Sequence, residues 1–137
     1  AMQVGMVDEE GAPTLKLSML LGYIFAPMAY LMGIPVKDCF AAGQMLGLRT
    51  IGNEFLAFQQ LNENLAGGNR VTERTQIILT YALAAFANIS SIGIQLGGIG
   101  AMAPERRGDL ARLGWRALLG GTLTASMTAC IAGILIA

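Results

Sequence analysis

The sequence predicts an all-α integral membrane protein. Of its 137 residues, 54% are hydrophobic and 13% are charged, whereas ordinary soluble domains are about 25% charged. The charges are unevenly placed, and three uncharged windows cover residues 17–36, 75–104 and 117–137. Each window is long enough, at about 1.5 Å per residue in a helix, to cross a hydrocarbon core of about 30 Å. These observations exclude an ordinary water-soluble domain.

Composition and charge exclude several classes of function. Nine basic and nine acidic residues cancel, so no net field attracts a nucleic acid or another polyanion. Histidine is absent, and Cys39 and Cys130 stand far apart, which removes imidazole metal sites, Ser-His-Asp and Cys-His catalysis, and CxxC motifs. We therefore expect no enzyme, no cofactor or metal centre, and no nucleic-acid partner.

The N-terminal part is expected to be a loop followed by one apolar helix. The chain starts at Ala1, and its early acidic residues do not resemble the basic opening of a signal peptide, which indicates a fragment or a processed chain. Residues 1–15 form the loop in this interpretation, and residues 16–36 form the helix. Hydropathy alone has this helix span the membrane, with Pro27 able to kink it.

The next segment, residues 37–66, carries too many charges to span. Its charged residues are Lys37, Asp38, Arg49, Glu54 and Glu63. We predict the two arms of a re-entrant hairpin, whose tip contains Gly52, Asn53 and Glu54. Residues 67–74 are polar and contain glycine, which predicts an exposed extracellular loop.

The middle window, taken as residues 75–103, is too long for one straight helix. The residues near its centre that favour irregular backbone are Asn88, Ser90, Ser91 and Gly93. We predict a broken transmembrane helix with halves at about 75–87 and 91–101. Such a break is tolerated at membrane depth where the freed backbone groups face protein or a wet cavity, so it indicates a binding site.

Residues 104–137 are predicted to form a cytoplasmic loop and the last transmembrane helix. The arginines that follow Pro104 are Arg106, Arg107, Arg112 and Arg116. Short loops rich in arginine stay on the cytoplasmic side, so we place this loop in the cytoplasm and the loop at 67–74 outside. We expect a multi-pass protein of the plasma or inner membrane.

Glu54 is the most informative single residue. It stands between apolar arms beside Asn53, and at membrane depth a carboxylate without a partner costs about 2.5 to 3.5 kcal/mol on insertion scales. One interpretation is an acid that binds a ligand or carries a proton. The other is a cap on the hairpin's second helix, with its charge favoured by the helix N-terminus. Catalysis by Glu54 ranks last, because no nucleophile or metal partner stands beside it.

Asn88, Ser90 and Ser91 offer amide and hydroxyl groups at the predicted break. Such groups suit the hydroxyls of a sugar, and they equally suit hydrogen bonds between packed helices. Gly93 and Gly97 add two small residues one turn apart, a spacing that permits close helix packing. The residues alone leave both interpretations open.

Two motifs make the sequence resemble the concentrative nucleoside transporter family. Residues 47–58, GLRTIGNEFLAF, are similar to the family's GxKxxxNEFVAY stretch. This chain has Arg49 in place of Lys, Leu56 in place of Val and Phe58 in place of Tyr. Residues 86–107 contain FANISS, GGIG and MAPERR, which resemble the family's FANxSS and GGxGxMAPxRR run.

The resemblance implies an all-helical homotrimer built from two inverted repeats, of which this chain looks like the second. Each repeat of the family carries a re-entrant hairpin and a discontinuous helix that meet near the bilayer midplane. In the family's layout, residues 16–36 are similar to an external helix that lies along the membrane surface. We prefer that placement to a membrane span.

Carried over by position, the resemblance implies a binding site for a nucleoside substrate. The residues that would bind the ribose are Glu54, with Asn53 beside it, Asn88 and Ser91, and Phe86 would line the nucleobase side. The family's cation site belongs to the first repeat, so the coupling ion, Na⁺ or H⁺, would bind outside this chain. The implied function is the C-terminal part of a cation-coupled nucleoside symporter in the lipid bilayer.

A structural alternative fits the same residues. It is a stand-alone small membrane protein that oligomerises through its glycines, with Glu54 serving only as a helix cap. This alternative predicts no transport activity and no ligand whose binding a Glu54→Gln substitution would weaken.

Overall fold

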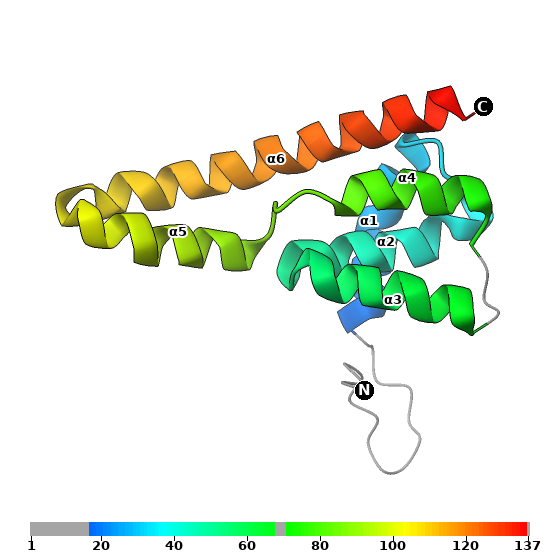
Figure 1. The fold of residues 1–137 in the computed structure, drawn as a ribbon, viewed down its shortest axis with the longest axis horizontal. Helices are drawn as coiled ribbons and strands as arrows, with labels where there is room; N and C mark the ends of the chain where they lie inside the picture. The colour runs from blue at the N-terminus through cyan, green and yellow to red at the C-terminus, as the bar shows by residue number, and fades with distance from the viewer. Residues whose placement is uncertain (1–16, 68–70, 137) are drawn as a thin grey trace, which may run out of the picture.

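The computed structural model describes residues 17–67 and 71–136. No strand occurs in this described part, and the predicted all-α fold class is confirmed. The elements in chain order (Figure 1) are α1 (Leu17–Leu31), α2 (Val36–Ile51), α3 (Glu54–Ala66), α4 (Glu73–Leu83), α5 (Ile89–Met102), the 3-10 turn η1 (Pro104–Arg106) and α6 (Arg107–Leu135). The loop predicted over residues 1–15 lies outside the described residues, as do residues 68–70 of the loop predicted at 67–74.

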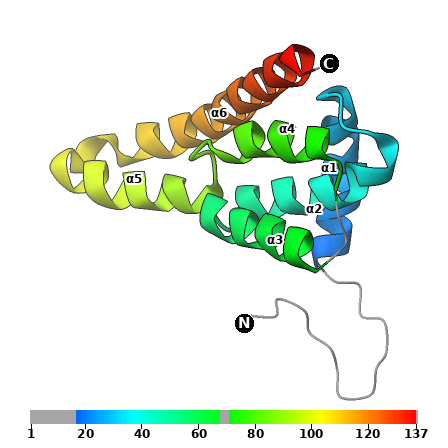
Figure 2. The same cartoon turned by 45° about the vertical axis from the view of Figure 1, so that its right-hand side comes forward.

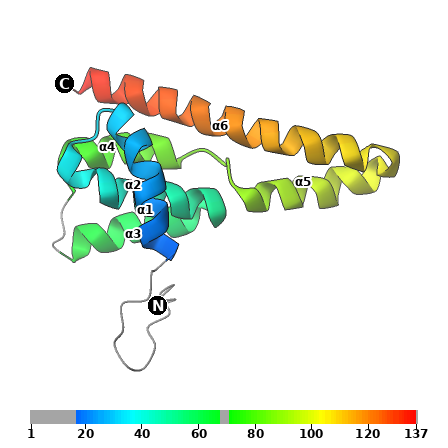
Figure 3. The same ribbon diagram turned by 180° about the vertical axis from the view of Figure 1, so that it is seen from behind.

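The apolar window at 17–36 is divided between a short helix and a sharp turn. α1 has 15 residues, which extend about 22 Å and so fall short of a hydrocarbon core of about 30 Å. A bend of 120° separates α1 from α2, and Gly33 in the turn has a φ of 84°, a conformation that favours glycine. α1 runs across α2 instead of alongside it (Figure 3). A side chain at Gly43 would collide with the Gly22 carbonyl, so glycine permits this close crossing.

α2 and α3 form a helical hairpin that turns at Gly52 and Asn53. The two helices run antiparallel, and their tip faces the gap between α4 and α5 (Figures 1 and 2). The apolar core joins this hairpin to α1, α4 and the second half of α6, and its members include Ala29, Met45, Leu46, Leu61, Ile78, Leu79, Leu83 and Ala129. The core therefore holds the hairpin in a defined position relative to the broken helix.

At the open end of the hairpin, Asp38 connects α2 to α4. Its carboxylate Oδ2 accepts hydrogen bonds from the Thr72 backbone N–H at 2.9 Å, the Thr72 hydroxyl at 2.7 Å and the Thr75 hydroxyl at 2.6 Å. Asp38 and Thr75 are buried, and Thr72 is the N-cap of α4. We call Asp38, Thr72 and Thr75 the base cluster. It fixes the first turns of α2 and α4 beside each other.

The break in the middle window lies earlier than predicted. It covers residues 84–88, whereas the sequence predicted helical halves at 75–87 and 91–101. Ser90, which the predicted bounds left in the break, lies in the first turn of α5 together with Ser91. The reason is that Asn88 caps this helix, with its Oδ1 accepting the Ser91 backbone N–H at 2.7 Å.

α6 returns along α5 and α4 and runs most of the length of the molecule (Figure 1). With η1 it forms the stretch Pro104–Leu135, the one helical stretch of the described residues that is by itself long and apolar enough to cross a membrane. The bent pair of α1 and α2 would make a second crossing if the pair formed one span. The turn between α5 and α6 lies at one end of the molecule, and the start of α4 lies toward the other.

Candidate substrate site

The tip of the hairpin is shaped by Asn53. Its side-chain Oδ1 accepts the Leu56 backbone N–H at 2.9 Å, which caps α3 and makes Glu54 the first residue of the helix. The interpretation of Glu54 as the cap is therefore wrong, because Asn53 has that role. Glu54 still benefits from the positive end of the helix dipole. Its carboxylate is free to make other contacts.

Glu54 and Asn88, 34 residues apart in sequence, meet where the tip faces the break. The Asn88 side-chain N–H donates to Glu54 Oε2 at 3.1 Å, and we call this hydrogen bond the tip contact. Asn88 is only 3% exposed, and its Oδ1 also accepts from the Ser91 hydroxyl at 2.9 Å. The Ser90 hydroxyl donates to the Gly52 carbonyl at 3.3 Å. The predicted site residues that the structure brings together are thus Asn53, Glu54, Asn88 and Ser91.

The Glu54 carboxylate keeps most of its capacity to accept hydrogen bonds. An ionised carboxylate offers about four acceptor positions, and within the described residues Asn88 is the one side-chain donor to it. Glu54 is also partly exposed, so the other positions are open to solvent or to a ligand. The tip can therefore accept hydroxyl donors from a polar ligand.

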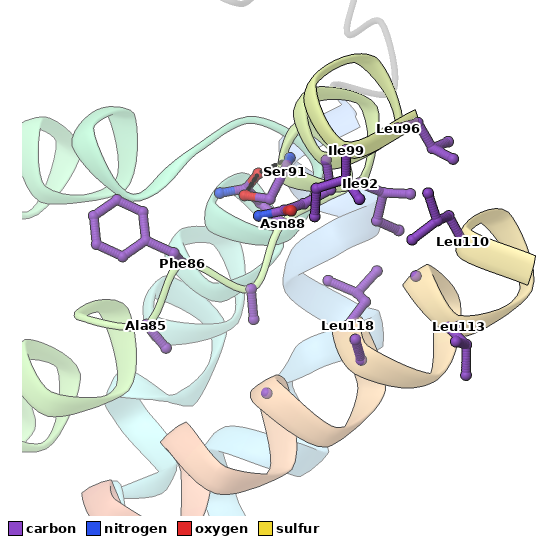
Figure 4. Close-up of a pocket in the computed structure, with 15 residues that line it drawn as sticks. Ala85, Phe86, Asn88, Ser91, Ile92, Leu96, Ile99, Leu110, Leu113 and Leu118 are labelled. Atoms are coloured by element: carbon purple, nitrogen blue, oxygen red, sulfur yellow. Dashed lines mark hydrogen bonds between the residues drawn. The ribbon is translucent and has the colours of Figure 1, made fainter. Parts of the chain in front are cut away.

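A cavity of about 450 Å³ lies beside the break, between α5 and the first half of α6 (Figure 4). Asn88 and Ser91 form a polar edge. The remaining wall is mostly aliphatic and includes Ile92, Leu96, Ile99, Leu110, Leu113 and Leu118. Pockets for small ligands typically occupy about 300–1,000 Å³ and combine apolar walls with a few polar groups. This cavity has both properties.

Phe86 and Glu54 occupy different positions relative to this cavity. Phe86 lines its edge, but its side chain is 76% exposed and the ring points away from the aliphatic wall (Figure 4). Glu54 is not among the lining residues. Asn88, which lines the cavity and donates to Glu54, connects the hairpin tip to the cavity.

Gln95 is a cavity residue that the sequence interpretation missed. It lies one turn after Ser91 on α5 and also lines the cavity. The available signal was spacing, because residues four apart on a helix share one face. Asn88, Ser91 and Gln95 place amide and hydroxyl groups along that face.

Arg49 is a second residue whose position the sequence did not indicate. It lies in the last turn of α2 and is only 1% exposed. Its Nη1 donates to the Ala82 carbonyl at 2.7 Å, and its Nη2 donates to the Thr122 hydroxyl at 3.3 Å. The one signal in the sequence was that a charged residue stands near the tip of an apolar arm, which could have suggested a buried contact for Arg49.

The chemistry of the site is that of polar recognition. Within residues 17–67 and 71–136, no group of three His, Cys, Asp or Glu side chains is placed to hold a metal ion. The groups that meet at the tip are a carboxylate, an amide and hydroxyls, together with backbone carbonyls. Groups of these kinds can donate to and accept from the hydroxyls of a polar ligand.

Comparisons with known proteins give the site its context. Residues 2–133 match the family model described as Na⁺ dependent nucleoside transporter C-terminus. The sodium/nucleoside cotransporter 1 of Mus musculus is 39% identical over 142 residues, which cover 95% of this chain and 22% of the relative. A protein of Haemophilus influenzae described as an uncharacterized transporter is 44% identical over 129 residues, which cover 92% of this chain and 31% of the relative.

A solved structure shares the fold. The structure of CNTnw in an inward-facing substrate-bound state superposes with a TM-score of 0.81 at 38% sequence identity, covering 87% of this chain and 29% of that protein. The chain thus spans between about a fifth and a third of the length of the proteins it matches. Because its relatives are transporters, this chain is a membrane protein. The chain belongs to the Na⁺-dependent nucleoside transporter family, whose C-terminal region its sequence matches.

Proposed function

We propose that this chain is the C-terminal part of a cation-coupled nucleoside symporter and that the hairpin tip and the helix break together bind the ribose of the nucleoside. The observation that carries the proposal is the tip contact between Glu54 and Asn88. It joins a carboxylate with open acceptor positions to a buried amide across two segments that are distant in sequence. Membership of a nucleoside transporter family supports a nucleoside as the ligand.

The chemistry of ribose fits these groups. The two neighbouring hydroxyls of a ribose are donors that the open acceptor positions of Glu54 satisfy. Asn88 and Ser91 supply donors and acceptors that fix the orientation of the ring. Asn53, which caps α3 beside Glu54, holds the start of that helix. Phe86, with its ring exposed beside the break, is placed to contact the nucleobase.

The coupling ion belongs to another part of the transporter in this proposal. Relatives described as sodium/nucleoside cotransporters support Na⁺ as that ion, with H⁺ as the alternative. This chain covers at most about a third of the relatives, so the remaining part has room for the cation site and for further contacts to the nucleobase. Binding and release need no covalent step.

The arrangement of the helices supports the proposed topology. The turn with Arg106 lies at one end of α6, and the C-terminus and the start of α4 lie toward the other (Figure 1). We place the arginine-rich end in the cytoplasm and the opposite end outside the cell. We also propose that the full-length protein is a homotrimer in the plasma or inner membrane.

The test is nucleoside uptake by a full-length transporter that contains this chain. Glu54→Gln keeps the size of the side chain but removes the charge that accepts hydroxyl donors, so we expect uptake to be abolished at unchanged surface expression. Glu63→Gln is the matched control, because Glu63 lies on the same helix but is exposed and away from the tip. We expect this control to transport normally.

Two results would contradict the proposed function. Normal uptake by the Glu54→Gln variant would remove the carboxylate from the site. Absence of uptake by the unaltered full-length protein, across purine and pyrimidine nucleosides and with both cations, would favour the oligomerising membrane protein instead.

A further inference from the structure

We infer that Arg49 is a positioning residue for the ribose site, because it fixes the hairpin tip to the end of α4 while Glu54 contacts the start of α5. The inference rests on the proposed function and adds to it a residue that need not touch the nucleoside. It concerns the opposite side of the helix break from the tip contact.

The burial of Arg49 is the first step. Arginine is almost never fully buried unless its charge is paired, yet Arg49 is 1% exposed and forms no ion pair among the described residues. Its contacts are the Ala82 carbonyl on α4 and the Thr122 hydroxyl on α6. One side chain of the hairpin thus holds two other helices.

The contact between Arg49 and the Ala82 carbonyl lies at the end of α4, where the break begins. Ala82 lies in the last turn of α4, where carbonyl groups have no partner within the helix and carry the negative end of the helix dipole. In a continuous helix this carbonyl would accept the N–H of Phe86, four residues on. Here Arg49 takes that position at 2.7 Å. The guanidinium therefore stabilises the end of α4 just before the break.

The hairpin tip consequently contacts both sides of the break. Arg49, five residues before Glu54, contacts the end of α4, and Glu54 contacts Asn88, which caps α5. A tip attached at only one side could pivot about that contact. With both contacts in place, the Glu54 carboxylate has a fixed position relative to the Asn88 amide. This geometry is what discrimination of ribose hydroxyls needs.

Arginine serves this position differently from the lysine that the family's motif carries. A guanidinium presents several donors in a planar fork and can serve two acceptors in different directions. An ammonium at the end of a lysine chain is a compact point charge. The second contact, to Thr122 on α6, is therefore the feature that Arg49 adds in this chain.

The experiment measures discrimination between a nucleoside and its 2′,3′-dideoxy analogue in the full-length transporter. The readout is the ratio of the two KM values, because a lower amount of folded protein changes Vmax and leaves this ratio unchanged. The variants are Arg49→Gln, Arg49→Lys and Thr122→Val, the last of which removes only the contact with α6. Arg74→Gln is the matched control, because Arg74 also donates to a backbone carbonyl, that of Gly33, far from the tip.

We expect the preference for the nucleoside to fall about tenfold in Arg49→Gln and about threefold in both Arg49→Lys and Thr122→Val. The control should keep the full preference. If Arg49→Gln does not reach the membrane, Arg49→Met replaces it, because methionine is a long side chain without a donor for the Ala82 carbonyl. An unchanged KM ratio in the variant that lacks the donor to Ala82 would overturn the inference. An unchanged ratio in Thr122→Val alone would assign the positioning to the contact with Ala82.

The two proposals fail in different ways. If the unaltered transporter shows no preference for the nucleoside over its dideoxy analogue, the ribose site itself is wrong, and the role of Arg49 falls with it. If the preference is present and Glu54→Gln abolishes uptake, while every Arg49 variant keeps the preference, the ribose site stands and only the inference about Arg49 is refuted.

Discussion

The two ends of the hairpin use a carboxylate in opposite ways. Asp38, in the first turn of α2, is 6% exposed, and one of its oxygens accepts three hydrogen bonds from Thr72 and Thr75. Glu54, in the first turn of α3, is partly exposed and accepts one side-chain hydrogen bond within the described part of the chain, from Asn88. Asp38 is satisfied by the protein, whereas Glu54 has acceptor positions to offer. The difference indicates that the number of donors around an acid separates a structural role from a ligand-binding one.

The comparison also explains why burial alone is a poor guide to function here. Asp38 is the more buried of the two acids, and a search for costly buried acids would select it first. Its hydrogen bonds offset that cost, and the base cluster keeps α2 and α4 together. Glu54 has less protein around it and more freedom to exchange partners. We therefore expect substitutions at the base to change stability and substitutions at the tip to change affinity.

Among substitutions of the residues that donate to the two acids, Asn88→Asp should have the largest effect. Aspartate is as good an N-cap as asparagine, so α5 should still begin at the same place, but the donor to Glu54 becomes a second carboxylate of like charge. We expect the KM for nucleoside uptake to rise about 100-fold. Asn62→Asp, on the exposed side of α3, is the control for added charge. An unchanged KM would make the tip contact irrelevant to binding.

Asp38→Asn should give the next effect, on stability. The neutral amide oxygen accepts more weakly than the carboxylate, so we expect the full-length protein to lose about 1–3 kcal/mol of folding stability. Thermal unfolding in detergent measures this loss, and Glu73→Gln, an exposed acid in the first turn of α4, is the control. The KM for nucleoside should stay within about twofold of the unaltered value. A large KM change without a lower melting temperature would erase the distinction between base and tip.

Thr75→Val should give the smallest effect. It removes one of the three donors to Asp38 and keeps the shape of the side chain, so a loss of about 1 kcal/mol is expected. In a protein that already carries Asp38→Asn, the same change should cost less, because the two residues share one interaction. Additive losses of stability would mean that Thr75 acts independently of Asp38.

The tip of the hairpin could be predicted from the sequence because its signals are local. Gly52, Asn53 and Glu54 combine a flexible residue, a helix cap and a charge between apolar arms, and the turn lies at that place. The all-helical fold followed from composition and from the lengths of the uncharged windows. These features depend on residues that are close in sequence.

The contacts that place the site could not be predicted in the same way. The tip contact joins residues 34 apart in sequence, and Arg49 reaches Ala82 and Thr122 across 33 and 73 residues. Three of the five residues between Ala82 and Asn88 are alanine, which favours helix. Local propensity therefore placed the break too late. A tertiary contact at the Ala82 carbonyl favours ending the helix before those alanines.

The two contacts of Arg49 have different consequences for how the family can change over time. The hydroxyl at Thr122 is a side-chain partner, so the residue types at positions 49 and 122 should covary among homologues. In homologues with lysine at position 49, we expect position 122 to vary between residues with and without a hydroxyl. The partner at Ala82 is a backbone carbonyl, which every amino acid supplies. The pattern of substitutions would thus reveal the contact with Thr122, whereas the contact with the Ala82 carbonyl would leave no trace in it.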